Sequence, residues 1–256
     1  MNDINILQEL KDSCYTGNDV RASWIADYNT DTDIPQFKNY AKWSLQHWNM
    51  YKGFINNIKQ NNKPVYILDA ACGIGFNTKM LAQEIPNSVL FGVDLDKNSI
   101  ELANKYNMDK NIVYKLDDLF NCSFDFKFDY IFFLEILEHI KSENHYIIVD
   151  KLLNLLNDDG YLFISTPNEL DNIDSLSGHI GLLNRTRALQ FINRYKNNMV
   201  QSSFYDNSKL HTSDYTIEEQ IDTYEYTSSG VGGILNAPNK SHFKIIMQKL
   251  NQIKPN

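Results

Sequence analysis

Cysteine and basic residues are both scarce in this sequence of 256 residues. The chain has three cysteines, and no two form a Cys-x-x-Cys pair, so neither a disulfide framework nor a zinc knuckle is indicated. Its 24 lysines and arginines are outnumbered by 32 aspartates and glutamates, for a formal net charge of −8. A protein that grips nucleic acid by its phosphates normally has a basic face. We therefore expect a small molecule, a sugar or a protein as the substrate, and no nucleic acid.

Long apolar runs are missing as well. The longest, residues 130–134, ends at Glu135 and is far shorter than the roughly 20 residues that span a bilayer. The first residues lack the basic segment and apolar run of a secretory signal. Hydrophobic residues make up 43% and charged residues 22% of the chain, which are globular values. We expect a cytoplasmic protein that buries a core and does not insert into a membrane.

From residue 64 onward, short apolar strands alternate with helical segments. This alternation predicts βαβ units and a doubly wound, mostly parallel α/β sheet. We predict strands over residues 65–69, 89–94, 111–116, 128–134 and 161–165, and helices over 76–84, 98–106 and 145–156, with a turn at 157–160. Beyond this core, the pattern predicts a helix over 187–195 and strands over 200–205 and 241–249.

We interpret the whole chain, residues 1–256, as a single domain with three parts. An aromatic stripe at helical spacing over residues 37–58 predicts a helix, so residues 1–60 form an N-terminal helical lid. Residues 61–168 form the core that holds the cofactor. Residues 169–256 form a substrate-facing segment and supply the last strands.

A glycine turn follows the first predicted strand and opens a helix, in the sequence DAACGIG at residues 69–75. Ligands of open parallel sheets bind beyond the carboxyl ends of the strands, and glycines let a ligand approach the backbone closely. Asp94 ends the second strand, where a carboxylate can accept hydrogen bonds from both hydroxyls of a ribose. A dinucleotide fold requires a third small residue, but Thr78 stands there. Asp69 would instead suit a ligand with an amino group.

These motifs resemble the class I S-adenosylmethionine-dependent methyltransferases. The similar blocks are ILDAACGIGFNTKMLA, FGVDLDKNSIELA, KLDDL, FDYIFFLEILEHI and DGYLFISTPN, in this order over about residues 64–168. The resemblance implies a Rossmann-like sheet of seven strands whose last strand, at residues 242–249, runs antiparallel. It also implies S-adenosylmethionine as the cofactor, with the amino acid moiety near Asp69, the ribose on Asp94 and the adenine amine on Asp117. The full set of cofactor-binding residues that we predict is Tyr51, Asp69, Ala71, Gly73, Gly75, Asp94, Leu95, Asp117, Asp118 and Glu135.

The family often closes this site with a helix that carries His-x-x-Arg-Tyr. Here the sequence reads His47-Trp48-Asn49-Met50-Tyr51, so Met50 replaces the arginine and another donor must bind the cofactor carboxylate.

Glu138 and His139 are the predicted catalytic residues. They follow the fourth strand, close to where the family directs the methyl group, and imidazole is a suitable base for a hydroxyl proton at neutral pH. His139 could equally serve only to orient the loop. We predict no metal ligands; a sharper alternative takes Glu135, Glu138, His139 and His179 as a Mg²⁺ or Mn²⁺ site, as in RNA ribose 2′-O-methyltransferases.

We therefore expect an enzyme that transfers methyl groups to a small-molecule or sugar acceptor, more specifically to a hydroxyl oxygen. Two alternatives of other classes stay open: a nicotinamide-dinucleotide oxidoreductase, and a cofactor-binding module without turnover. The sequence does not identify the acceptor or the oligomeric state.

Overall fold

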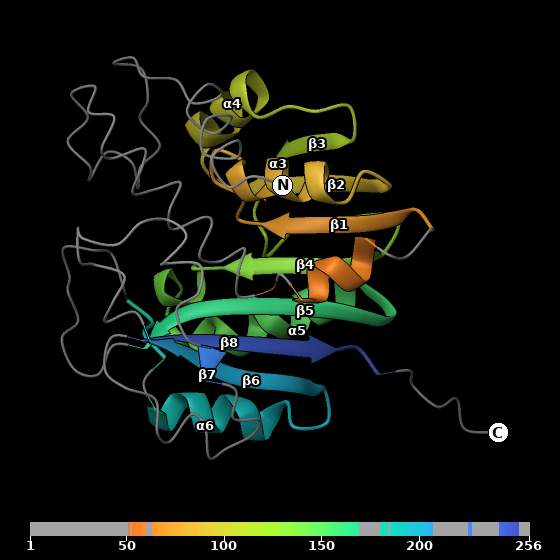
Figure 1. Ribbon diagram of the computed structural model, residues 1–256. Coiled ribbons are helices and arrows are strands. Elements are labelled where there is room, and N and C mark those ends of the chain that lie inside the picture. The colour runs from red at the N-terminus through yellow and green to blue at the C-terminus, as the bar shows by residue number, and fades with distance from the viewer. Residues whose placement is uncertain are drawn as a thin grey trace, which may run out of the picture. The chain divides into compact units, whose positions relative to one another are not determined.

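The computed structural model describes residues 51, 53–59, 63–168, 180–183, 185–206, 225–226 and 241–250 of the chain (Figure 1). The described residues up to Ser123 form one compact unit, and those from Phe124 onward form a second. The interpretation of the chain as a single domain with three parts stays a prediction.

The first unit is a parallel sheet with two helices that follow its strands. Its strand order is β3-β2-β1, with β1 parallel to β2 and β2 parallel to β3 (Figure 1). Helices α3 and α4 both contact β2 and β3. The elements in chain order are β1 (Val65–Ala70), α3 (Phe76–Glu84), β2 (Ser88–Asp94), α4 (Lys97–Tyr106) and β3 (Ile112–Leu116). All five were predicted to within a residue of these bounds.

Local sequence explains where these elements begin. Ile67 and Leu68, on opposite faces of β1, are both fully buried, as expected of a strand covered on two sides. Helix α4 begins after Asp96, whose side chain accepts a hydrogen bond of 3.0 Å from the backbone N–H of Ser99. Such a cap satisfies one of the amides that a helix start leaves without an intrahelical partner.

A helical stretch lies within residues 51–59. Tyr51, Ile55 and Ile58 are all at most 3% exposed, and their spacing puts them on one helix face. Lys59 pairs with Glu84 at the end of α3. The remainder of the helix predicted over residues 37–58 lies outside the described residues, as does most of the predicted lid.

The second unit carries the antiparallel part of the fold. Its strand order is β4-β5-β8-β6-β7; β4 and β5 are parallel, and β8 is antiparallel to both β5 and β6. The prediction of an antiparallel last strand is confirmed. The elements are β4 (Phe128–Leu134), the 3₁₀ turns η1 (Leu137–His139) and η2 (Ser142–Asn144), α5 (His145–Leu155), β5 (Leu156–Asn168), α6 (Arg185–Arg194), β6 (Met199–Asp206), β7 (Glu225–Tyr226) and β8 (Ser241–Gln248). The two-residue β7 pairs with β6, so the described residues contain eight strands where seven were expected.

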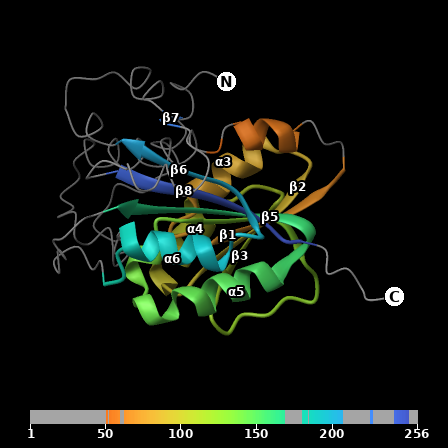
Figure 2. The same cartoon turned by 90° about the horizontal axis from the view of Figure 1, so that it is seen from below.

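Helices α5 and α6 lie side by side on one face of this part of the sheet (Figure 2). The ring of Tyr146 on α5 stacks on that of Phe191 on α6, with 6.2 Å between centroids. The Arg194 guanidinium lies over the Tyr146 ring and donates a hydrogen bond of 2.8 Å to Asp150.

The turn predicted at residues 157–160 is corrected by the structure, because these residues lie within β5 as a bulge. Phe128 pairs with Leu156 and Tyr130 with Tyr161, so four residues of β5 stand opposite a single residue of β4. Asp159 adopts a left-handed conformation with φ of 64°. The Asn-Asp-Asp-Gly sequence suits such a bulge as well as it suits a free turn.

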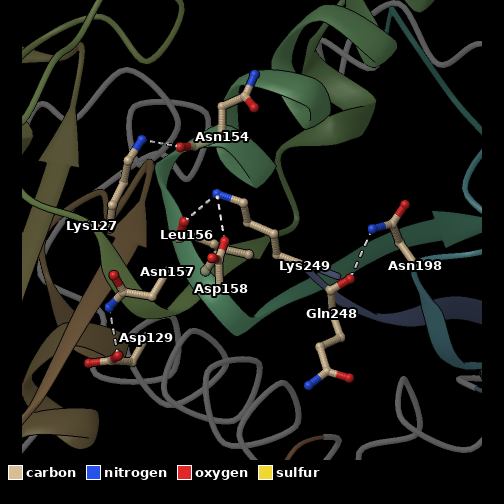
Figure 3. A network of polar contacts seen from close by, with 9 residues as sticks. All are labelled: Lys127, Asp129, Asn154, Leu156, Asn157, Asp158, Asn198, Gln248 and Lys249. Atoms are coloured by element: carbon tan, nitrogen blue, oxygen red, sulfur yellow. Dashed lines mark hydrogen bonds and ion pairs between the residues drawn. The ribbon is translucent and has the colours of Figure 1, made fainter. Parts of the chain in front are cut away.

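A network of polar contacts at the start of β5 holds this bulge in place (Figure 3). The Lys249 ammonium donates to the Leu156 carbonyl at 2.8 Å, and Asn157 donates to the Asp129 carboxylate at 2.8 Å. The Lys249 carbonyl also accepts the Asp159 backbone N–H at 2.9 Å. Lys249, directly after β8, therefore anchors the start of β5.

Among the helices that the structure describes, none has the length and apolarity needed to cross a membrane.

Candidate functional site

The turn after β1 runs through three left-handed residues. Ala71, Gly73 and Gly75 have φ of 62°, 54° and 82°, a conformation that costs an L-residue free energy and that glycine adopts readily. The Cys72 backbone N–H donates to the Val93 carbonyl at 3.0 Å, which ties the turn to the end of β2. The chain then enters α3 directly after Gly75. The turn thus brings Gly73 and Gly75, which carry no side chain, to the start of the helix.

Tyr114 of β3 underlies this turn and was not singled out from the sequence. Its hydroxyl donates to the Asn107 carbonyl at 2.9 Å and lies 3.3 Å from the Gly75 carbonyl. A Cβ on Gly75 would overlap that hydroxyl, and a Cβ on Gly92 would lie 2.6 Å from the Tyr114 ring. Gly92, an isolated glycine within an apolar strand, was the available sequence signal of such a close approach.

Asp94 at the end of β2 has a carboxylate that backbone amides hold in place. One oxygen accepts the Gly73 N–H at 2.8 Å, and the other accepts the Asp96 N–H at 2.8 Å. Burial raises the pKa of Asp94 above its ordinary value, and these two hydrogen bonds oppose that rise. Each carboxylate oxygen can accept a further hydrogen bond. The carboxylate is therefore oriented before any ligand binds, with accepting capacity left on both oxygens.

Asp69 at the end of β1 is 3% exposed. It accepts a hydrogen bond of 2.5 Å from the hydroxyl of Thr78, which is itself fully buried. Burial raises the pKa of Asp69 from 3.8 to about 7, and the nearby Asp94 adds to the rise while Thr78 opposes it. The approach of a cation would stabilise the ionised form of such a buried carboxyl.

Asp117 and Asp118 follow β3, and Leu95 follows β2. The Asp117 N–H donates to the Asp94 carbonyl at 3.0 Å, and its carboxylate pairs with Lys115 at 2.6 Å. Asp118 accepts the Phe120 backbone N–H at 2.9 Å and so stabilises its own turn. Leu95 is 73% exposed. Because β1, β2 and β3 are parallel, the predicted residues of this unit from Asp69 to Asp118 gather at one edge of its sheet. Tyr51, the remaining predicted cofactor-binding residue of this unit, lies in the helical stretch of residues 51–59 and is buried, at 1% exposure.

In the second unit, Glu135 directly follows β4 and has a left-handed conformation with φ of 57°. Its backbone N–H donates to the Ser165 carbonyl of β5 at 2.9 Å. A non-glycine residue in this region is strained, and such strain is frequently found at functional sites.

Glu138 and His139 lie together in the turn η1 that follows. Glu138 is 2% exposed and accepts a hydrogen bond of 3.0 Å from the Thr166 hydroxyl. Its other carboxylate oxygen lies 4.0 Å from His139 Nε2, and the His139 side chain is 42% exposed. A buried, oriented carboxylate beside an accessible imidazole is an arrangement suited to proton transfer.

Within the described ranges, no cluster of three or more His, Cys, Asp or Glu side chains could hold a metal ion. His179, the fourth ligand of the alternative metal site, lies outside these ranges, so that alternative is not tested.

A family model described as "Methyltransferase domain" matches residues 46–210, well over half of the chain. The chain belongs to this family. The match covers the glycine turn, Asp94 and the Glu138–His139 pair within one continuous segment.

Curated relatives of this methyltransferase domain align with only part of it. An uncharacterised protein of Rickettsia prowazekii is 36% identical over 103 residues, which are 39% of this chain and 41% of the relative. A malonyl-[acyl-carrier protein] O-methyltransferase of Priestia megaterium is 27% identical over 51% of this chain and 49% of its own length. A mitochondrial ubiquinone biosynthesis O-methyltransferase of Dictyostelium discoideum is 27% identical over 45% of this chain and 41% of its own length. The chain thus spans less than half the length of these relatives.

Solved methyltransferase structures match nearly the whole chain. Plantazolicin methyltransferase BpumL in complex with SAH has a TM-score of 0.58 at 15% identity, over 96% of this chain and 97% of its own. Magnesium protoporphyrin IX methyltransferase of Synechocystis PCC 6803 with bound SAH has a TM-score of 0.55 at 14% identity, over 88% and 92%. At these identities the likeness shows the fold, which is the Rossmann-like α/β fold of methyltransferases.

Proposed function

We propose that this protein is an enzyme that transfers a methyl group from S-adenosylmethionine to a hydroxyl oxygen of a small-molecule or sugar acceptor. The observation that carries the proposal is the Asp94 carboxylate, which the Gly73 and Asp96 amides orient at 2.8 Å each. An oriented pair of carboxylate oxygens beside a glycine turn suits the two hydroxyls of an adenosine ribose.

Asp69 fits the amino acid end of the same cofactor. Its carboxyl is buried, and its pKa of about 7 leaves it poised to ionise beside a cationic amino group. Asp117 lies after the neighbouring β3 and fits the adenine amine as a hydrogen-bond acceptor. A dinucleotide-binding turn has a third small residue, Gly or Ala, at the position of Thr78. Here the Thr78 hydroxyl donates instead to the Asp69 carboxylate.

On the acceptor side, His139 is the base and Glu138 supports it. S-adenosylmethionine, when bound, supplies an electrophilic methyl group whose bond to sulfur breaks with the electron pair left on sulfur. The His139 imidazole takes the hydroxyl proton as the acceptor oxygen forms its bond to the methyl carbon. Buried Glu138 stabilises the imidazolium that results, from 4.0 Å. Alignment of the reacting atoms supplies the remainder of the catalysis.

The cofactor assignment is tested by calorimetric titration of S-adenosylhomocysteine and, separately, of NAD. We expect micromolar binding of S-adenosylhomocysteine and none of NAD. Asp94→Ala should weaken binding at least tenfold, and the exposed Asp125→Ala should retain it as a matched control. Binding of NAD alone would overturn the proposal.

The acceptor assignment is tested by detection of S-adenosylhomocysteine released over a panel of phenols, sugars, amines and carboxylic acids. A hydroxyl acceptor with a rate that falls at least a hundredfold in His139→Gln supports the role of His139. Turnover confined to amines or carboxylic acids, or unchanged in His139→Gln, contradicts it.

A further inference from the structure

Residues 180–183 dock through their backbone onto the turn that carries Glu138 and His139. The N–H groups of Ile180 and Gly181 both donate to the Glu138 carbonyl oxygen, at 2.9 Å each. A carbonyl oxygen has two lone pairs, so these two donors saturate it. The main chain of the catalytic turn is therefore held by a segment more than 40 residues further along the chain.

Gly181 is the residue that makes this close approach feasible. A Cβ added there would overlap the Ile140 carbonyl oxygen and lie 2.7 Å from His145 Nε2. His145 Nε2 in turn lies 2.8 Å from the same Ile140 carbonyl and serves as its donor. His145 is 3% exposed, and burial lowers its pKa, which keeps the ring neutral with its proton available for this bond. No side chain larger than hydrogen fits at position 181 without moving the turn.

The docking segment is itself anchored. Leu182 and Leu183 are buried, at 8% and 1% exposure, and the Arg187 guanidinium of α6 donates to the Leu182 carbonyl at 3.1 Å. Ile180, by contrast, is 56% exposed, so this residue contributes its amide and little of its side chain. The segment is therefore anchored by buried leucines and by a hydrogen bond to α6, in addition to its contact with the Glu138 carbonyl.

We propose that Gly181 is a positioning residue: the backbone of residues 180–183 fixes the turn Leu137–His139 and thereby sets the placement of the Glu138 carboxylate and the His139 imidazole. The proposal rests on the proposed function, in which this pair handles the acceptor proton. Gly181 acts through main-chain atoms, the Glu138 carbonyl that its amide engages and the Ile140 carbonyl that a Cβ there would overlap.

The test replaces Gly181 by alanine and follows the turn by NMR, without any acceptor. Ile180→Ala is the control from the same segment, since it removes an exposed side chain and keeps the amide. Gly53→Ala is the matched glycine control, since nothing lies within 4 Å of a Cβ there. The ring signal of His139 is identified among the six histidines by its loss in His139→Gln.

In Gly181→Ala we expect faster hydrogen exchange at the amide of residue 180, by about tenfold, the change that loss of one ordinary hydrogen bond gives. We also expect a displaced ring signal of His139. In the two controls the His139 signal should be unchanged, and so should the exchange at residue 180 relative to the rate of an unstructured peptide of the same sequence. Faster exchange with an unmoved His139 signal would show that the segment detaches while the pair stays in place, and this overturns the proposal; unchanged exchange overturns it as well.

If Gly181→Ala fails to fold, Arg187→Ala replaces it. This variant removes the donor to the Leu182 carbonyl from an exposed helix position and should displace the His139 signal in the same direction by a smaller amount. Failure of wild-type protein to bind S-adenosylhomocysteine would instead count against the proposed function, because that binding is assigned to residues of the first unit.

Discussion

The buried carboxyl of Asp69 makes this protein less stable at neutral pH than it would be without the charge. In the folded state its pKa is about 7, raised from 3.8 mainly by burial. Between these two values the folded state keeps a proton that the unfolded state has lost. The stability that the neutral form provides is therefore complete below pH 3.8 and is lost progressively as pH rises to about 7.

Asp69→Asn should remove this dependence, because the amide does not titrate and its oxygen can still accept the Thr78 hydroxyl. From pH 5 to the folded pKa of about 7 there are roughly two pH units, at about 1.4 kcal/mol each. The stability of Asp69→Asn relative to wild type should thus increase by about 3 kcal/mol between pH 5 and pH 8.

Urea denaturation of both proteins at pH 5 and pH 8 measures this difference, with the linear extrapolation applied at each pH. Asp125→Asn is the control, an exposed carboxylate whose effect should be the same at both pH values. A relative stability of Asp69→Asn that differs by less than about 0.5 kcal/mol between the two pH values would refute the reasoning, because an unshifted carboxyl is already ionised at pH 5.

Three further predictions concern the cofactor end and the bulge. Asp94→Ala should weaken binding of S-adenosylhomocysteine at least tenfold by calorimetry, since a charge-assisted hydrogen bond contributes about 1.5–3 kcal/mol; an unchanged Kd would remove Asp94 from the site. Gly92→Ala should destabilise the protein by about 1–3 kcal/mol in urea because the new methyl group meets the tyrosine beneath the turn. Gly53→Ala should cost nothing, and equal effects of the two would contradict this packing explanation. Lys249→Met should lower the free energy of unfolding in urea by about 1 kcal/mol, the net value of its hydrogen bond to the β5 backbone. A variant as stable as wild type would contradict this role.

The core elements were predictable because their signals are local. Helix α3 and strand β4 have the bounds that the sequence predicted, Phe76–Glu84 and Phe128–Leu134. A glycine turn and Pro86 delimit the first, and a continuous apolar run defines the second. The glycine turn also located Asp69 and Asp94 correctly at strand ends, since loops after parallel strands converge at one edge.

The features that escaped prediction depend on partners far apart in the chain. Residues 157–160 carry the composition of a turn, and the Lys249 that holds them in β5 is 93 residues away from Leu156. Gly92 is required by Tyr114 on the adjacent strand, and Gly181 by the carbonyl of Ile140. None of these pairs has a sequence spacing that periodicity or propensity could reveal.

The two groups of proposed functional residues are held by partly different means, and this bears on how each tolerates change. Asp69 and Asp94 are fixed through their own carboxylates, by Thr78 and by the Gly73 amide, so a substitution at either position removes the group and its support together. The Glu138 carboxylate is held likewise by the Thr166 hydroxyl, but the main chain of its turn is also held, by the amides of Ile180 and Gly181. Main-chain support does not depend on which side chains the supporting segment carries, except at Gly181, where no side chain fits. Side-chain changes in residues 180–183 should therefore leave the backbone of this turn in place, provided that position 181 remains glycine.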